Sequence, residues 1–192
     1  MPKNKVKYGI CNVHYAKATL SEEGKVTYDV PVPIPGAKTL AVAPTGEVGK
    51  YHADNILFYQ TPGAGGYEGD LEVALIPDEF HIDILGDKRD DNGGILEVNL
   101  AQTNYFALLF QFEGDVKATR HCLYYCTASR PEISGETVEE TVTPGVEKLS
   151  FASTARPDNG NVKYRTTPEM NEETYNRWFN AVPEPSFAAG QE

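Results

Sequence analysis

The chain has 192 residues, a formal net charge of −11 and a sequence pI of about 4.8. A tight phosphate-binding surface needs clustered lysine and arginine, so this acidic balance disfavours specific binding of nucleic acid. The length predicts a single domain over residues 1–192, which is large enough to bury a core without disulfides.

Strands separated by turns are predicted along the first quarter of the chain. Val6–Thr19 is a strand or an arm, and Lys25–Val32 is a strand. The proline-rich run Pro31–Gly36 interrupts it, because proline cannot donate to a central hydrogen-bond ladder. The next strand is Ala37–Ala43. Residues 44–66 then form a long excursion between two sheet strands, and connections of that length are commonly disordered or functional.

The middle of the chain combines a strand, a helix and a short strand. In the strand Tyr67–Ile76, Leu71, Val73 and Leu75 face one way, while Asp70, Glu72 and Ala74 face the other. A short helix is expected over Glu79–Leu85, and a short strand over Ile95–Leu100. In that helix Asp78 is the expected N-cap, Gly86 the stop, and the apolar stripe consists of Phe80, Ile84 and Leu85.

The segment Phe106–Pro131 is predicted to be a sheet-building hairpin, because apolar residues alternate along both of its arms and Glu113–Asp115 forms a polar turn. It contains no evident catalytic group. Strict alternation on the return arm places Cys122, Tyr124 and Cys126 on one face, and Leu123, Tyr125 and Thr127 on the other.

The last third begins with a polar, acidic linker over Pro131–Gly145. Strands follow at Val146–Ala155 and Asn161–Arg165. A second helix is predicted over Asn171–Ala181, and a frayed tail over 183–192. In that helix Asn171 is the expected N-cap, and the buried side consists of Tyr175, Trp178 and Phe179. This order predicts a mainly β fold, a sandwich or partly open barrel with a helix on its flank.

The termini and cysteines indicate where the protein is made. The first ten residues carry basic side chains but no apolar stretch of a secretory signal, and no segment has the roughly 20 apolar residues that span a bilayer. Cys122 and Cys126 are four residues apart on one predicted strand, so their Cα atoms are about 13 Å apart, too far for a disulfide. We therefore expect a soluble cytoplasmic product with packed thiols and no membrane partner.

Catalytic and metal-binding patterns are sparse. The four histidines have no metal-ligand spacing, and the loop Gly63–Gly66 lacks the ending of a phosphate-binding loop. A nucleophilic pair of Cys126 with His81 or His52 is a possible arrangement, but a packed thiol is the favoured interpretation. Asp70 and Glu72 lie two apart on one strand, and nothing places them across a cleft as in a glycosidase. We expect no catalytic residue, no metal and no cofactor.

Acidic side chains form the one pattern of physical interest. Asp70 and Glu72 share a strand face, and Glu113 and Asp115 lie close to a turn expected nearby. The pattern alone favours an ordinary solvated face. If this face lined a channel, it would repel DNA phosphates and let DNA slide without sticking.

Several blocks, in the same order and over roughly residues 5–180, resemble the major tail proteins of siphophages, which are tail tube subunits. The resemblance implies two packed β-sheets, of the tail-tube sandwich or barrel type, with a flanking α-helix and a second short C-terminal helix. No single block carries a mechanism. The blocks are Tyr8–Ala16, Pro31–Ala37, Tyr51–Ile56, Gly66–Phe80, Phe106–His121, Cys126–Pro131 and Asn176–Phe179.

The same resemblance implies how the subunit works. Such subunits form hexameric rings that stack into a hollow tube, through which DNA passes without specific binding. Strands of neighbouring subunits join into one barrel around the lumen, and a long loop contacts the adjacent ring. The implied partners are further copies of the chain and the tail terminator, tape-measure and tail-tip proteins, with assembly in the bacterial cytoplasm and a final place in the virion. No additional immunoglobulin-like domain is expected.

Position within the family pattern assigns the candidate residues. Asp70 and Glu72 are the candidates for the lumen lining. The 44–66 excursion is the candidate inter-ring loop. A β-sandwich binding module of the carbohydrate or adhesin type is the alternative, since the chain has eleven tyrosines, and a small enzyme is a third and weaker possibility. The candidate loop residues are Glu47, Lys50, Tyr51, Asp54, Asn55 and Tyr59.

Overall fold

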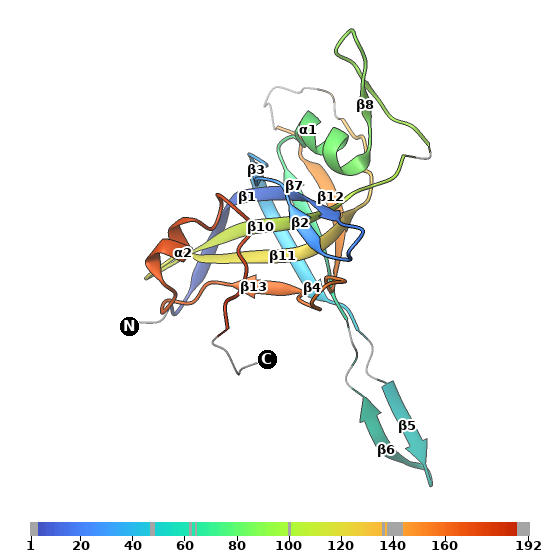
Figure 1. The fold of residues 1–192 in the computed structure, drawn as a ribbon, viewed down its shortest axis with the longest axis vertical. Coiled ribbons are helices and arrows are strands. Elements are labelled where there is room, and N and C mark those ends of the chain that lie inside the picture. Colours follow the sequence, from blue (N-terminus) through green and yellow to red (C-terminus); the bar gives the residue numbers. More distant parts are fainter. Residues whose placement is uncertain are drawn as a thin grey trace.

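One large antiparallel sheet forms most of the molecule (Figure 1). The computed structural model describes residues 4–46, 49–61, 63, 65–99, 101–135, 137 and 144–187. The strands of this sheet run in the order β2–β1–β10–β11–β12–β7–β4, with β3 beside β1 and β13 beside β11. Their bounds are β1 Lys7–Leu20, β2 Val26–Tyr28, β3 Val32–Pro33, β4 Ala37–Pro44, β7 Tyr67–Val73, β10 Tyr105–Gly114, β11 Thr119–Ala128, β12 Glu147–Thr154 and β13 Lys163–Arg165.

The large sheet folds over on itself into two packed layers. One layer contains β1, β10 and β11, and the other contains β12, β7 and β4. β11 connects the two layers. Its residues 125–128 pair with β12 of the second layer, whereas its residues 121–123 pair with β13. The predicted mainly β fold with two packed layers is confirmed, and the two layers are halves of one hydrogen-bonded sheet. Within the described residues the sheet does not close into a barrel.

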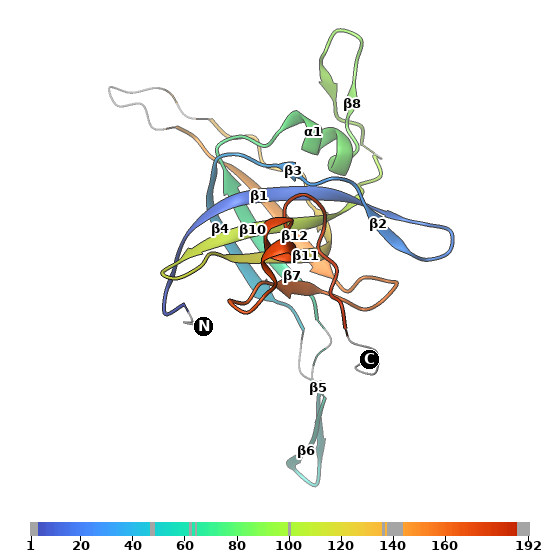
Figure 2. The same cartoon turned by 60° about the vertical axis from the view of Figure 1, so that its left-hand side comes forward.

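The core lies between these layers, where both contribute apolar side chains. Phe106, Leu108 and Phe110 of β10 point into it and meet Leu71 of β7 and Leu149 of β12. The opposite face of β10 is also buried, because the C-terminal segment crosses it and places Trp178 against Ala107 and Leu109 (Figure 2). The first layer is therefore covered on both sides, whereas the second has one open face.

A β-bulge in β11 overturns one prediction about the cysteines. Phe106 pairs with Cys126 but Leu108 pairs with Leu123, so β11 has one more residue than β10 in this interval. An extra residue inverts the side-chain alternation beyond it. Cys122 consequently lies beneath Trp178, while Cys126 lies in the core between the layers. The prediction that the two thiols share a face is wrong, and both are free and buried.

The first helix covers the predicted segment and begins one residue earlier, but it is less regular than predicted. It consists of α1 (Asp78–Phe80) continued by a π-helical segment, η1 (His81–Leu85). Pro77 occupies the N-cap, so the prediction of Asp78 as N-cap is wrong by one residue. Gly86 ends the segment with φ 81°, as predicted, because glycine adopts the left-handed region without strain. The expected apolar stripe is confirmed, since Phe80, Ile84 and Leu85 are all buried.

Two other elements end earlier than the patterns indicate. β7 stops at Val73, because the Ala74 N–H donates to the Gly36 carbonyl as the chain turns. Leu75 is therefore 66 % exposed and Ile76 takes the buried position, contrary to the predicted alternation. α2 spans only Glu172–Asn176, although Asn171 caps it as predicted by accepting from the Glu173 and Thr174 N–H groups.

The excursion between β4 and β7 contains an ordered hairpin. β5 (Gly49–Ala53) and β6 (Ile56–Thr61) form a two-stranded sheet that projects from the body (Figures 1 and 2). A second small sheet pairs β8 (Lys88–Arg89) with β9 (Ile95–Leu96), so the predicted strand Ile95–Leu100 is short, and Leu100 lies outside the described residues.

The linker and the tail are described only in part. Of the predicted linker, residues 136 and 138–143 lie outside the described chain. Of the predicted frayed tail, Pro183 is buried and residues 188–192 lie outside. No helix among the described residues is long and apolar enough to cross a membrane.

Candidate functional site

The open face of the second layer carries Asp70 and Glu72, the two acidic residues that the sequence assigned to a channel lining. Because Leu40, Leu71 and Leu149 pair with one another and point into the core, their neighbours along each strand point outward. We name this surface the acidic sheet face. Register places its side chains in three rows across the strands: Thr39, Glu72 and Lys148; Ala41, Asp70 and Ser150; Ala43, Glu68 and Ala152.

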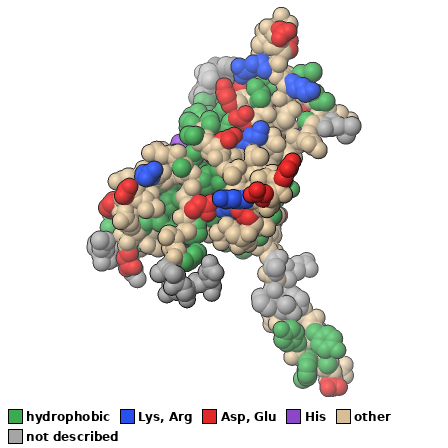
Figure 3. Space-filling view, in the orientation of Figure 1, with side chains coloured by type: hydrophobic (Ala, Val, Ile, Leu, Met, Phe, Trp, Pro, Cys, Tyr) green, Lys and Arg blue, Asp and Glu red, His purple; other side chains and the backbone are tan. Residues whose placement is uncertain are grey.

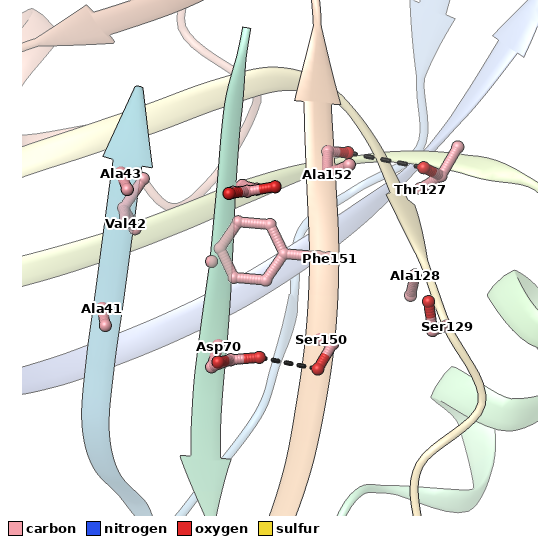
Figure 4. Close-up of a pocket in the computed structure, with 12 residues that line it drawn as sticks. Ala41, Val42, Ala43, Asp70, Thr127, Ala128, Ser129, Ser150, Phe151 and Ala152 are labelled. Carbon is pink, nitrogen blue, oxygen red and sulfur yellow. Dashed lines mark hydrogen bonds between the residues drawn. The ribbon is translucent and has the colours of Figure 1, made fainter. Parts of the chain in front are cut away.

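Asp70 lies at the centre of this face (Figure 4). Its carboxylate accepts a hydrogen bond of 2.6 Å from the Ser150 hydroxyl and pairs with the Lys148 ammonium at 2.9 Å. These two contacts lower the pKa of Asp70, the Ser150 hydrogen bond most. Glu72, in the next row, accepts from the Thr39 hydroxyl at 2.9 Å. Asp70 and Glu72 therefore share one outward face, as the alternation predicted.

The acidic sheet face is shallow and lined by small side chains. Its groove contains Ala41, Ala43 and Ala152 beside Asp70 and Ser150. Gly69, between Glu68 and Asp70, faces the core instead, where a Cβ would lie 2.8 Å from the Phe151 ring and 2.3 Å from the Ala41 carbonyl oxygen. Between the charged side chains, the outward surface of this face consists of small residues.

Two of the acidic residues grouped by the sequence do not belong to this face. Glu113 is the penultimate residue of β10 in the other layer, where it accepts from the Cys11 thiol and the Gln111 amide. Asp115 accepts from the Lys5 N–H. The separation follows from topology, because β10 pairs with β1 and β11 and not with β7. Glu68 joins the face instead, and the same alternation along β7 would have identified it.

The β5–β6 hairpin is the second candidate surface. Its two-residue turn, Asp54–Asn55, has φ values of 52° and 60°, which match the right-handed twist of a hairpin. Lys50, Tyr51 and Tyr59 lie on the strands, and all five of these candidate residues are exposed. Glu47, the remaining candidate of the predicted loop, lies outside the described residues.

Large apolar side chains cover this hairpin (Figure 3). Sequence reasoning selected the tyrosines and polar residues of the loop and missed the apolar run on β6. Tyr51 packs edge-to-face against Phe58, with ring centroids 6.4 Å apart, and this contact within the hairpin leaves both rings largely in solvent. The side chains that are 46–66 % exposed are Tyr51, Ile56, Leu57, Phe58 and Tyr59.

Such a hairpin is a weak structure on its own. A two-stranded sheet in water is marginally stable because it has no covered face. Contiguous exposed apolar side chains on a soluble protein mark an interaction surface. The hairpin therefore has the composition of a contact element that another surface covers.

The C-terminal segment is held on the first layer by a buried guanidinium. Arg156 is nearly inaccessible, and it pairs with Asp158 at 2.7 Å and with Glu184 at 2.5 Å. The Tyr124 hydroxyl donates to the Pro183 carbonyl at 2.7 Å. The Arg156 hydrogen bond is the largest influence on Asp158 and lowers the pKa of that carboxyl. These contacts fix the segment that covers β10.

The nucleophilic and metal-binding chemistry considered from the sequence does not assemble. Cys126 is fully buried and its thiol contacts the Leu123 carbonyl; burial raises its pKa to about 12, so it is a neutral thiol at physiological pH. His52 is on the exposed hairpin, and His81 pairs with Asp87 at 3.2 Å. The described residues contain no cluster of three or more side chains suited to a metal ion.

Comparison with known proteins agrees with this description. A family model described as phage tail tube protein matches residues 2–120, which is more than half of the chain. The chain belongs to the phage tail tube protein family. It is therefore a structural protein of a phage tail. No curated protein matches it.

One solved structure shows a similar fold. This tail tube protein is similar to a chain in the cryo-EM structure of the anti-feeding prophage baseplate, with 10 % identity and a TM-score of 0.51. That match covers 88 % of this chain and 100 % of the other. A chain from the tube-terminating cap of the same particle matches with 9 % identity and a TM-score of 0.48, over 86 % and 96 % of the two chains.

Proposed function

We propose that this chain is the subunit of a long, non-contractile phage tail tube that polymerises as stacked hexameric rings around an acidic channel and conducts DNA without binding it specifically. The β5–β6 hairpin is the observation that carries the proposal. It presents five large, exposed apolar side chains on an element that projects from the body, and a contact between rings covers such an element.

Formation of a ring is supported by the free edge of the second layer. β4 is the last strand of the large sheet on its side, so one row of its backbone N–H and C=O groups has no strand partner among the described residues. An unpaired edge is a template for a strand of another chain. Contacts of this heterologous kind close into a ring when the rotation between copies permits it.

The acidic sheet face is the candidate channel lining. Glu68, Asp70 and Glu72 outnumber Lys148, and the remaining outward side chains in the three rows are small and uncharged. Negative charge on a channel wall lowers its affinity for DNA phosphates. In this arrangement Asp70 and Glu72 act by repelling DNA, and the subunit has no enzymatic role.

The proposed partners follow from this role. Further copies of the chain form the rings, and the tail terminator, tape-measure and tail-tip proteins meet the two ends of the tube. Assembly takes place in the cytoplasm of the bacterial host, and the finished tube is part of the virion. A carbohydrate-binding module is less well supported, because Tyr51, Phe58 and Tyr59 are exposed on the hairpin, whereas none of the exposed aromatic side chains of the described residues lines the groove of the acidic sheet face.

Negative-stain electron microscopy of the purified protein over a concentration series tests the proposal. We expect hollow tubes or stacked rings that become longer and more numerous as concentration rises. A chain that stays monomeric at every concentration, and also after addition of tail-tip extract, would contradict the proposed function. The extract is the necessary second condition because a tube can require an initiating complex.

A further inference from the structure

A groove at the start of β4 has the properties of a docking site. It lies between the first half of β1 and the β3–β4 connection, and Ile10, Val13, Ile34, Pro35 and Ala37 are among its lining residues. Most of this lining is apolar. Pro35 is exposed and Ile10 and Ala37 are half-buried, so the groove is open to a partner.

The outer edge of β1 is unpaired in the part of this groove that precedes Val13, whose carbonyl accepts from the Ile34 N–H. β1 pairs with β10 on one side over its length, but on the other side it meets β3 only at His14 and Tyr15 and β2 only from Ala18 onward. Among the described residues, no strand lies against the outer edge of β1 between Lys7 and Asn12. The groove therefore offers both apolar contact and free backbone groups, which is the combination that accepts an added strand.

The hairpin has the complementary properties. Among the strands that the structure describes, β5 and β6 pair only with each other, so neither outer edge has a described strand beside it. Their apolar side chains Tyr51, Ile56 and Phe58 are exposed. The groove and the hairpin each have an unpaired strand edge and exposed apolar side chains. Each can therefore supply the backbone hydrogen bonds and the apolar contacts that the other lacks.

Position along β4 brings the two surfaces together in neighbouring copies. The groove adjoins Ala37, where β4 begins, and the hairpin departs after Pro44, where β4 ends. Figures 1 and 2 show the β3–β4 connection and the hairpin at opposite ends of the body. A copy displaced along the direction of β4 therefore presents its groove to the hairpin of the preceding copy. The contact joins two different surfaces, so it repeats without limit, as growth of a tube requires.

The hairpin is long enough for this contact. From Thr45 to the turn at Asp54 the chain has nine residue steps, which extend about 30 Å at roughly 3.3 Å per residue. β4 itself covers seven steps, or about 23 Å. The reach of the hairpin, about 30 Å, thus exceeds the length of β4, the strand that lies between the hairpin and the groove of the same subunit.

We propose that the β5–β6 hairpin of one subunit docks in the β1–β4 groove of a second copy in the adjacent ring, where Ile10, Pro35 and Ala37 receive its apolar side chains. This inference rests on the proposed function, since it names the partner surface of the inter-ring contact. It goes further by assigning the first half of β1 and the proline-rich connection to that interface.

Disulfide cross-linking tests the contact directly. Two variants are prepared in a Cys11→Ser background, one with Ile56→Cys on the hairpin and one with Pro35→Cys in the groove. Cys122 and Cys126 are fully buried and do not compete. The variants are mixed, allowed to assemble and oxidised with copper phenanthroline. A docked pair has an effective concentration in the millimolar range, so the cross-link should form on the order of a thousandfold faster than in a micromolar unassembled mixture.

A matched variant, Ser129→Cys, places an exposed thiol in the other groove, on the acidic sheet face. The inference is supported if, in tubes, Ile56→Cys forms a disulfide with Pro35→Cys and forms none with Ser129→Cys. Tubes in which it joins Ser129→Cys, or neither, overturn the docking site and leave the proposed function standing. If the unmodified chain forms no tubes, with or without tail-tip extract, and the cross-link does not form, both the docking site and the proposed function are overturned.

Discussion

The carboxylate of Asp70 and the ammonium of Lys148 form an ion pair of 2.9 Å that bridges β7 and β12 on the acidic sheet face. Lys148 is the only cation in the three rows of outward side chains, which also contain Glu68, Asp70 and Glu72. Three carboxylates against one ammonium leave a net charge of −2 in these rows. Because its contacts lower the pKa of Asp70, this carboxyl stays ionised below the pH at which an unpaired aspartate begins to be protonated.

Reversing this charge should make the tube bind DNA. In the double variant Asp70→Lys and Glu72→Lys the three rows change from −2 to +2, since each substitution adds two positive charges. We expect these tubes to co-sediment with duplex DNA at low salt and to release it as salt rises, because phosphate contacts depend steeply on ionic strength. The control Glu22→Lys and Glu23→Lys, in the exposed turn after β1, should behave as wild type. Equal DNA binding by both double variants would argue against a channel lining.

Removing the apolar side chains of the hairpin should abolish assembly without unfolding the subunit. In Phe58→Ser with Tyr59→Ser, both altered positions are more than half exposed, so the monomer loses little buried area. We expect an unchanged thermal midpoint by circular dichroism and no tubes by electron microscopy. Val30→Ser removes an apolar side chain of similar exposure between β2 and β3 and should assemble normally. Normal tubes from the hairpin variant would show that the hairpin is dispensable.

Arg156→Met should destabilise the monomer by about 3 kcal/mol, because it leaves the carboxylate of Asp158 without its buried partner. Arg177→Met is the matched control: Arg177 pairs with Glu173 at 3.6 Å, but both side chains are more than 70 % exposed. An exposed pair of this kind contributes less than about 0.5 kcal/mol. Urea denaturation of the two variants beside wild type measures the difference, and similar losses for both would contradict the role of Arg156.

The same ion pair should make stability depend on pH. The pKa of Asp158 is lower in the folded protein than in the unfolded chain, so its contribution is complete above the unfolded value of about 3.9 and is lost as pH falls through the folded value. We expect the stability gap between wild type and Arg156→Met to narrow steadily below about pH 4. Thermal melts from pH 7 to pH 2 measure this gap, and a constant gap over that range would exclude the linkage.

Gly69→Ala should cost about 1–3 kcal/mol, which is the range for overpacking a tight site. The added Cβ would lie 2.3 Å from the Ala41 carbonyl oxygen and 2.8 Å from the Phe151 ring, so β4 or Phe151 has to move. At Gly145 a Cβ meets no atom within 4 Å, and Gly145→Ala should be close to neutral. Chemical denaturation of both variants compares these costs, and equal stability would mean that the sheet yields easily at Gly69.

The alternation of apolar and polar residues predicted the outward face of β7 correctly. In a regular strand, the position of a residue along that strand alone decides on which face its side chain lies. Asp70 and Glu72 face outward, while Leu71 and Val73 are buried. The same reasoning failed for Cys126, because the bulge that turns it depends on the register between β10 and β11. It failed for Leu75 because the end of β7 is set by a hydrogen bond to Gly36, far away in sequence.

The hairpin was only partly predictable. A connection of this length between two strands predicted a functional excursion, and the Asp54–Asn55 turn between two runs containing tyrosine indicates a hairpin when the segment is considered alone. The exposure of Phe58 was not predictable, because an apolar run is ordinarily a buried strand. Whether such a run is buried depends on the rest of the fold, and here no other described strand pairs with β5 or β6.

The separate sheet of β5 and β6 also bears on how such a protein can diversify. The large sheet folds around a core to which this hairpin contributes no residue. If the hairpin makes the proposed contact, changes within residues 49–61 should alter which copies recognise each other while leaving the folding of each copy intact. Two related phages that infect one cell could keep their subunits from mixing by differing in this short segment and in the surface that receives it. A few exposed positions would then determine which subunits assemble with one another, independently of the sheet that carries these positions.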